Sequence, residues 1–304
     1  MQAKTRRLAA GFPRATFARM SPEMRQKAMW LLPPAAWFVV FLLVPYLITA
    51  YYSFGHMQSY RYVPGFSLAN YIRIFSTAPY SGAIAQSAVI GLLTAVFSSL
   101  AAYPVAMVMA FCITRPAARS AMYVLVILPW WASYLVKAYA WKTILGPHGI
   151  LNSLLVDLHL IASPMTILLY NQASVVLTLT YIFTPFAILS IYASLERIPA
   201  SLLEAAEDLG AGGVQIFWRI ILPLSVPGLL AGAVITFALG FGDFVAPALL
   251  GGADTLMIST IMINLLGVAN DRPLASAIGI IIAGLAFLLI GLMDWAERRV
   301  TVRL

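Results

Sequence analysis

Long apolar runs separated by short polar segments dominate the chain. A helix needs roughly 20 apolar residues to cross the hydrocarbon core of a bilayer, and six segments are long enough. Because backbone polar groups in lipid must be hydrogen-bonded within the structure, and the sequence lacks the short alternating segments of a β-barrel, we predict helices. The pattern predicts an all-α, polytopic transmembrane helical bundle of about six spans, near residues 30–54, 84–111, 120–143, 172–195, 223–247 and 273–294.

Three of the segments outside these spans are candidates for further helices. After the turn at Pro64 and Gly65, residues 67–75 are expected to form a short surface helix. Residues 145–171 contain a leucine-rich stretch that is expected to lie as a helix at the membrane interface. Part of the basic N-terminal segment, residues 14–27, is either a helix on the anionic inner leaflet or a disordered tail.

Composition identifies lipid as the expected solvent. Of the 304 residues, 62% are hydrophobic and 10% are charged, whereas a soluble domain carries about 25% charged residues. The net charge of +8 does not indicate a nucleic-acid partner, because the basic residues lie between apolar spans and form no single patch. The single cysteine, Cys112, excludes a disulfide framework.

The distribution of basic residues predicts the orientation. The apolar run from Met29 to Phe54 is too long for the core of a signal peptide and no small-residue cleavage site follows it, so it is expected to be a retained first span. Most of the 19 basic residues fall on the side of the N-terminal tail, including Arg115, Arg119 and Arg197. Basic loops favour the cytoplasmic side. We therefore expect a multi-pass protein of the bacterial inner membrane with both termini in the cytoplasm.

The cytoplasmic segment between the fourth and fifth spans has the most distinctive pattern. Pro199 suits an early helical position, and Ser201 is a possible helix cap. Acidic residues and alanines around Glu204 favour a helix, and Gly210 is expected to end it. A second short amphipathic piece, residues 214–221, then leads into the fifth span. The segment is expected to form a compact helical knob that fits the groove of a partner protein.

The same segment resembles the signature loop of permease subunits in binding-protein-dependent ABC importers. The pattern is Glu-Ala-Ala, three residues, Gly, nine residues, Ile, one residue and Leu-Pro. The resemblance implies the type I ABC importer permease fold and a coupling helix that docks into an ATPase subunit. The implied coupling residues are Glu204, Ala205, Ala206, Asp208, Gly210, Ile220, Leu222 and Pro223.

From about Trp30 onward, the chain is similar to the spermidine/putrescine branch of this family, and to the larger of its two permease subunits. Residues 128–141, 203–211 and 247–252 carry this similarity, with one departure at Lys137, where arginine is expected. The resemblance implies a polyamine solute and three kinds of partner protein: an ABC ATPase subunit, in two copies, a paralogous second permease, and a periplasmic solute-binding protein. Opines, amino-acid-like amines and aminophosphonates remain alternative solutes.

The resemblance also implies a division of the chain into four segments. They are a cytoplasmic basic tail (1–29), the first transmembrane helix with its outer loop (30–83), an ABC transmembrane type-1 core (84–297) with the coupling loop 196–223, and a cytoplasmic C-terminal tail (298–304).

An acidic residue within the fifth span is the best candidate for contact with the solute. Asp243 lies among Gly240, Gly242 and Pro247, which disfavour a continuous helix, and an ionisable residue within a span marks a functional site by default. A polyamine is a flexible polycation that carboxylates and aromatic faces can hold. Two other interpretations stay open: an ion pair with Lys137, or exposure at the outer interface. The expected pathway residues are Asp243, Trp130, Tyr134, Phe241, Phe244 and Tyr181.

Small residues mark expected close contacts between helices. Gly228 and Gly232 form a Gly-x-x-x-Gly motif in the fifth span, and Gly279 with Ala283 forms a looser version in the sixth. Packing within the subunit and contact with a second permease subunit both stay open for these motifs.

Catalytic motifs are missing from the sequence. None of the four lysines follows a glycine, so there is no phosphate-binding Gly-Lys loop. The three histidines lack metal-ligand spacing and lie outside the expected spans. We expect no catalytic site, no metal and no cofactor on this chain, with ATP and Mg²⁺ bound by the partner ATPase. An ion-coupled secondary transporter and a membrane enzyme or assembly factor remain the alternatives. The inverted repeats that a secondary transporter favours are not visible.

Overall fold

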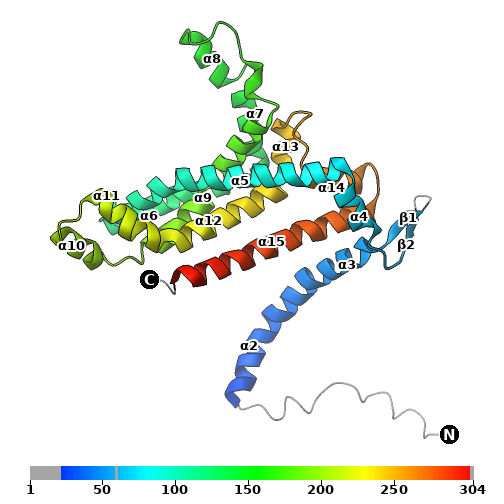
Figure 1. The fold of residues 1–304 in the computed structure, drawn as a ribbon, viewed down its shortest axis with the longest axis horizontal. Coiled ribbons are helices and arrows are strands. Elements are labelled where there is room, and N and C mark those ends of the chain that lie inside the picture. The colour runs from blue at the N-terminus through cyan, green and yellow to red at the C-terminus, as the bar shows by residue number, and fades with distance from the viewer. Residues whose placement is uncertain (1–21, 59–60, 302–304) are drawn as a thin grey trace. The chain divides into compact units, whose positions relative to one another are not determined.

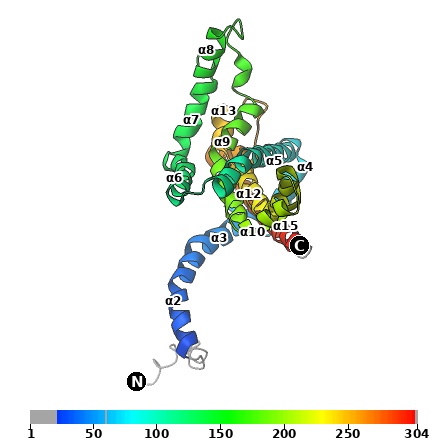
Figure 2. The ribbon, with the colours of Figure 1, turned by 90° about the vertical axis from the view of Figure 1, so that its left-hand side faces the viewer.

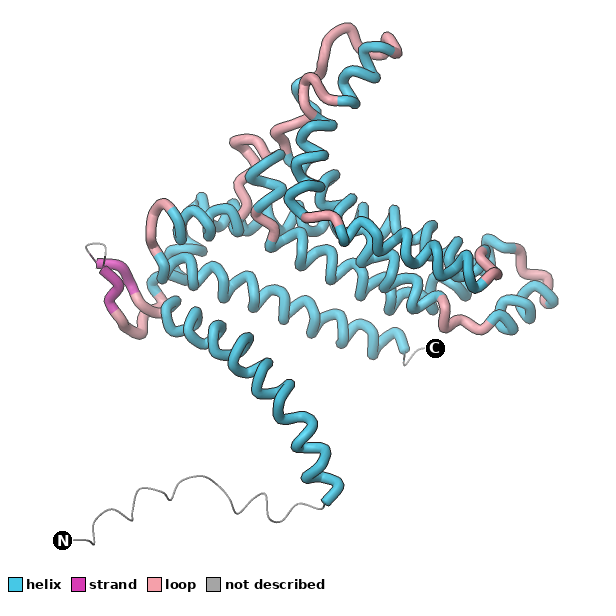
Figure 3. Tube along the Cα trace, turned by 180° about the vertical axis from the view of Figure 1, so that it is seen from behind, coloured by secondary structure: helices cyan, strands magenta, loops and turns pink. Residues whose placement is uncertain are grey.

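The computed structural model describes residues 22–58 and 61–301, and most of them are helical (Figures 1 and 3). The expected tail helix at residues 14–27 lies largely outside the described residues. The helices are α2 (Pro22–Phe38), α3 (Val44–Ser53), α4 (Ala69–Ser76), α5 (Ala78–Met107), α6 (Pro116–Ile127), α7 (Tyr134–Leu145), α8 (Ile150–Asp157), α9 (Gln172–Leu195), α10 (Ala200–Asp208), α11 (Gly213–Ile216), α12 (Leu222–Gly242), α13 (Val245–Leu250), α14 (Ile258–Gly267) and α15 (Arg272–Thr301). Strands β1 (His56–Gln58) and β2 (Arg61–Val63) form a small antiparallel hairpin that the hydrophobic pattern did not predict.

Contacts divide the chain into two compact units, with the boundary between Tyr51 and Tyr52. The first unit holds α2 and most of α3, joined by a π-helical turn at Val39–Leu43. Its side chains from Met29 to Ile48 are exposed. The most apolar stretch of its long helix has no buried residue. Because this segment is apolar on every side, lipid or another protein must cover it.

The second unit is built around α5, α9 and α12, which lie side by side (Figure 1). A Cβ atom on Gly228 would lie 2.6 Å from the carbonyl oxygen of Ser190, and one on Gly232 would lie 3.1 Å from the Cα of Ala187. The Gly-x-x-x-Gly motif of α12 therefore packs against α9 within this chain. A Cβ on Gly279 would meet only the sulfur of Met262 at an ordinary 3.7 Å, so that glycine is not required for close packing.

Five of the expected spans are confirmed as continuous apolar helices: Met29–Ser53, Ala78–Cys112, Gln172–Leu195, Gly213–Gly242 and Arg272–Met293. The third is broken, because Pro116–Trp131 and Tyr134–Asp157 meet at an angle of 86°. Pro129 has no N–H to donate to the preceding turn, and α6 accordingly ends at Ile127, before a short 3₁₀ segment. Figures 1 and 2 both show α7 and α8 extending away from α5, α9 and α12.

Both helices expected outside the spans are confirmed. Helix α4 begins two residues later and ends one residue later than the expected range 67–75, and α8 forms within residues 145–171. Asn152, fully buried on α8, donates to the carbonyl oxygens of Gly146 and Met165 at 2.9 and 3.0 Å, and accepts from the N–H of Met165 at 2.8 Å. One amide thus fixes the loop on both sides of α8.

Candidate coupling loop and solute pathway

The loop between α9 and α12 forms two short helices, as its sequence predicts. Helix α10 follows Pro199, whose extended backbone (φ −66°, ψ 134°) ends the preceding turn. No side chain caps this helix, and Ser201 lies inside its first turn, so the expectation that Ser201 is the cap was wrong. The N–H groups of Gly210 and Ala211 donate to the carbonyl oxygens of Glu207 and Ala206 at 2.8 and 3.0 Å, which is the bonding of a Schellman cap.

The two faces of α10 differ in what they contact. Leu203 and Ala206 pack against the core that contains Ile216. Glu204, Ala205 and Asp208 are exposed on the other side. Apolar contacts thus hold the knob to the bundle and leave its small and acidic residues free for a partner.

The second half of the loop carries exposed apolar side chains. Helix α11 continues through a π-helical turn, Phe217–Ile221, directly into α12, which begins with Leu222 and Pro223. Ile220, Leu222 and Pro223 are half-buried. Leu209, Val214 and Trp218 are 89%, 75% and 62% exposed. Exposed apolar residues in the segment that follows α10 are typical of a protein-binding surface.

An ionic network lies at the base of this loop. Glu196 Oε1 accepts from the hydroxyl of Tyr192 at 2.9 Å and lies 3.7 Å from Nη1 of Arg119. Nη2 of Arg119 also donates to the carbonyl oxygen of Ile113 at 3.2 Å. This network connects the start of α6 to the end of α9 on the side of the bundle that carries the knob.

Gly210 is the position of the loop where a side chain should have the largest conformational cost. Its φ of +84° is disfavoured for any residue with a Cβ, by about 1–2 kcal/mol. If this loop docks into an ATPase subunit, as its resemblance to the signature loop implies, Gly210→Ala should weaken that docking about 5- to 30-fold, measured by co-purification and titration in detergent. Gly213→Ala is the matched control, because a Cβ there also meets nothing within 4 Å but φ is not positive. Equal behaviour of both variants would contradict a role for the Schellman cap.

Asp243 lies at a break between two helices. Helix α12 ends at Gly242, and Oδ1 of Asp243 accepts from the backbone N–H of Ala246 at 2.8 Å, in the first turn of α13. Its other carboxylate oxygen, Oδ2, accepts from the hydroxyl of Tyr134 at 2.5 Å. The hydroxyl of Ser259, on α14, donates to the carbonyl oxygen of Asp243 at 2.5 Å. The expected interruption of the helix near Asp243 is confirmed, and three elements fix the residue there.

The Tyr134–Asp243 bond joins two interrupted spans. Tyr134 is the first residue of α7, directly after the bend in the third span, and Asp243 directly follows α12. Within the described part of the chain, Asp243 and Lys137 form no ion pair; the pairs found are Arg73–Asp271 and Arg119–Glu196. The phenol, and not the ammonium, is therefore the partner of this carboxylate in the structure.

Aromatic rings continue from Tyr134 along α9. The ring of Tyr134 lies 6.4 Å from that of Phe183, which lies 6.4 Å from Phe186, and Phe186 lies 4.4 Å from Trp130. Sequence reasoning identified Tyr134 and Trp130 but missed Phe183 and Phe186. Their separation of three positions on one helix places them on neighbouring parts of one face, and this spacing could have identified them.

The other expected pathway residues are more dispersed. Phe241 is only 2% exposed and stacks on Phe237 in the core, so the structure does not place its ring beside the carboxylate of Asp243. Tyr181 is half-exposed and lies edge-on to Trp141. Phe244 is exposed and adjoins Asp243 in sequence. No cluster of metal-binding side chains occurs in residues 22–58 and 61–301.

Known proteins share this organisation. Residues 27–302 match the family described as the binding-protein-dependent transport system inner membrane component. The chain is 33% identical to a spermidine/putrescine transport system permease protein of Haemophilus influenzae, over 84% of this chain and 88% of that protein. It is 34% identical to an inner membrane ABC transporter permease protein of Escherichia coli, over 81% and 82%.

Solved structures show the same fold. A chain of a bacterial ABC transporter involved in the import of the acidic polysaccharide alginate superposes with a TM-score of 0.72 and 24% identity, covering 92% of this chain and 96% of that one. A chain of a methionine ABC transporter superposes with a TM-score of 0.56 and 16% identity, covering 72% and 95%. With its several apolar helices, this is a multi-pass inner-membrane protein, and the chain belongs to the family of inner-membrane components of binding-protein-dependent transport systems.

Proposed function

We propose that this chain is one of two permease subunits of an ATP-driven importer for a polyamine such as spermidine or putrescine. The similarity of the chain to spermidine/putrescine transport system permease proteins supports this solute class. The observation that carries the proposal is the Asp243 carboxylate, placed at an interruption between helices with an aromatic row beside it. A negative charge at such a position suits a cation, and its removal from water has to be balanced by a ligand or a partner.

The geometry suits an exchange of partners at Asp243. In the structure, Oδ2 accepts from the neutral hydroxyl of Tyr134. An ammonium group is a charged donor, and its hydrogen bond to a carboxylate is roughly twice as strong as one between neutral groups. The ammonium would replace or share the phenol bond, while Oδ1 stays bound to the N–H of Ala246. Trp130, which is 37% exposed, and the half-buried Phe186 would contact the next amino groups of the same chain-like solute through cation–π interactions, while the buried ring of Phe183 supports them from behind.

The coupling loop supplies the proposed connection to ATP. Helix α10 would dock its exposed face, with Glu204, Ala205 and Asp208, into a groove of the ATPase subunit, which binds ATP and Mg²⁺. Two ATPase copies, a paralogous second permease and a periplasmic binding protein complete the proposed assembly. In this arrangement the loop and both termini face the cytoplasm, in keeping with the basic residues around the loop.

Uptake measurements on the reconstituted complex test this proposal. We expect proteoliposomes that contain the complex to accumulate radiolabelled spermidine when ATP and binding protein are supplied. Uptake should stop without ATP and persist when ionophores collapse the ion gradients. Loss of uptake when ionophores collapse the gradients would instead indicate an ion-coupled transporter. Stronger competition by 2-aminoethylphosphonate than by putrescine would overturn the solute class while leaving the ATP-driven mechanism in place.

A further inference from the structure

Helix α4 has an apolar face that no other part of the described chain covers. Leu68, Ile72 and Phe75 are 60%, 66% and 62% exposed, and helical spacing places them on one side. Asn70 and Ile74, on the opposite side, are 8% and 0% exposed. A shallow hollow of about 490 Å³ runs along the apolar side, lined by Leu68, Tyr71, Ile72, Phe75 and Ser76.

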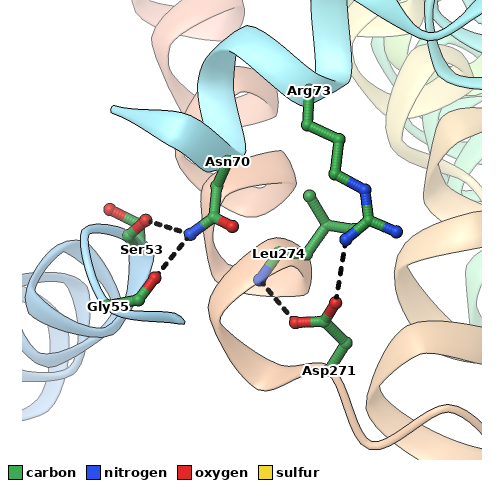
Figure 4. A network of polar contacts seen from close by, with 6 residues as sticks. All are labelled: Ser53, Gly55, Asn70, Arg73, Asp271 and Leu274. Atoms are coloured by element: carbon green, nitrogen blue, oxygen red, sulfur yellow. Dashed lines mark hydrogen bonds and ion pairs between the residues drawn. The ribbon is translucent and has the colours of Figure 1, made fainter. Parts of the chain in front are cut away.

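Polar side chains of α4 bind the ends of two spans (Figure 4), and a third span follows α4 directly. Nδ2 of Asn70 donates to the carbonyl oxygens of Ser53 and Gly55, both at 2.8 Å, where the first span ends. Nη1 of Arg73 lies 3.5 Å from Oδ2 of Asp271, whose other oxygen accepts from the N–H of Leu274 in the first turn of α15. Thr77 both ends α4 and precedes α5. The helix is therefore held at the level where three apolar spans begin or end.

The position of α4 at the ends of the spans indicates what contacts its apolar face. The ends of apolar spans mark the boundary between hydrocarbon and headgroups, and short helices with one apolar side bind at this boundary. The ring of Phe66, which is 90% exposed, adds to the apolar surface near α4 and stacks at 5.5 Å on Phe54, the residue after Ser53. A docked protein would have to reach down to this boundary, whereas lipid is already there.

The polar flank of the helix suits a lipid headgroup. The guanidinium of Arg73 lies between Asp271 and the ring of Tyr80, 5.9 Å from the ring centroid, and its side chain remains 54% exposed. A guanidinium held in this way can bind a phosphate oxygen with its free N–H groups.

We propose that α4 is an interfacial lipid-binding helix, with Leu68, Ile72 and Phe75 inserted among acyl chains and Arg73 directed at headgroup phosphates. The choice of the outer leaflet rests on the proposed orientation. Helix α5 begins beside α4, and near its other end Tyr103 contacts Ser225 at the start of α12, beside the coupling loop. Helix α4 and the coupling loop therefore lie at opposite ends of α5.

Site-directed spin labelling of the full complex tests the proposal. Cys112, the single cysteine of this chain, is exposed, so a Cys112→Ser background assembled with partner subunits whose own cysteines are replaced permits one label at a time. Phe75→Cys places a label on the apolar face, and Ala69→Cys places the matched control on the flank beside Arg73; both positions are exposed. The complex is reconstituted in vesicles of phosphatidylethanolamine and phosphatidylglycerol, and collision rates with oxygen and with a water-soluble nickel chelate are measured. We expect the ratio of oxygen to nickel collisions to be several-fold higher at position 75 than at position 69.

Each other outcome overturns the proposal and names a different occupant. Free collision of the label at position 75 with the nickel chelate shows water at this face. Protection from both reagents before binding protein is added shows that another subunit covers it. Protection that develops only with solute-loaded binding protein shows a docking site for that protein. Because none of these readouts depends on solute uptake, a failure here is distinguishable from a failure of the polyamine assignment.

Discussion

Replacing Asp243 with asparagine should lower spermidine uptake by about 10- to 100-fold without preventing insertion of the subunit. A hydrogen bond to a charged group contributes about 1.5–3 kcal/mol, and each 1.4 kcal/mol corresponds to a factor of ten. Asparagine retains an oxygen for the N–H of Ala246 and can still bond to the hydroxyl of Tyr134, so the break between α12 and α13 should persist. The measurement is the initial rate of radiolabelled uptake in proteoliposomes with equal amounts of complex.

Two further variants separate a charge effect from a structural one. Asp254→Asn removes an exposed carboxylate from the loop before α14 and should leave uptake unchanged. Tyr134→Phe removes the phenol bond to Oδ2 but retains the charge of Asp243. If Asp243 acts only by holding α7 through Tyr134, Tyr134→Phe should lower uptake more than Asp243→Asn does, because asparagine can still bond to the hydroxyl of Tyr134 and phenylalanine has none. Retained uptake in Tyr134→Phe with loss in Asp243→Asn identifies the carboxylate as the group that binds the solute.

Replacing Ala205 with tryptophan should abolish uptake and the recruitment of the ATPase subunit. Ala205 is exposed on the side of α10 opposite to Leu203 and Ala206, which pack against the core. A large side chain at Ala205 meets no other part of this chain's core, so the loop should still fold. The same side chain would fill the space that a partner groove needs for close contact. Co-purification of the ATPase with a tagged permease measures the first effect, and uptake measures the second.

An exposed alanine in the loop after α13 provides the control. Ala253 lies in the loop between α13 and α14, away from the coupling loop, and Ala253→Trp should leave ATPase recruitment intact. Normal recruitment by Ala205→Trp would show that the exposed face of α10 is not the docking surface. If both variants insert poorly into the membrane, the cause is the size of tryptophan and not the position of the substitution. Ala205→Glu would then repeat the test with a charged side chain.

The spans could be predicted from the sequence because lipid imposes both length and composition on a helix. The interruption near Asp243 was also predictable, since Gly240, Gly242 and Pro247 are poor helix residues within an apolar run. The 86° bend before Tyr134 was not, because hydropathy is the same on both sides of Pro129 and carries no information about direction. A proline within a helix can kink it or end it, and tertiary contacts decide which.

The pathway residues were harder to predict than the coupling loop. The loop is a local structure, so its helix formers and Gly210 determine most of its shape. The surroundings of Asp243 depend instead on residues distant in sequence, such as Tyr134 and Ser259. Phe241 shows the same limit. It lies one helical turn from Phe237 and faces the core, but α12 is apolar on all sides, so its sequence does not show which side faces the core.

The unbroken course of α12 has a mechanical consequence. The helix has 21 residues from Leu222 to Gly242, a length of about 30 Å, with the coupling loop at one end and Asp243 at the other. Near Asp243 it touches α5 almost backbone to backbone, since a Cβ on Gly91 would lie 3.2 Å from the carbonyl oxygen of Phe237 and one on Gly240 would lie 3.4 Å from the Cα of Gly91. If a partner tilted the end of α12 that carries the coupling loop, the helix would rotate about its contact with Gly91. The few residues beyond that contact would then move the Asp243 carboxylate relative to Tyr134.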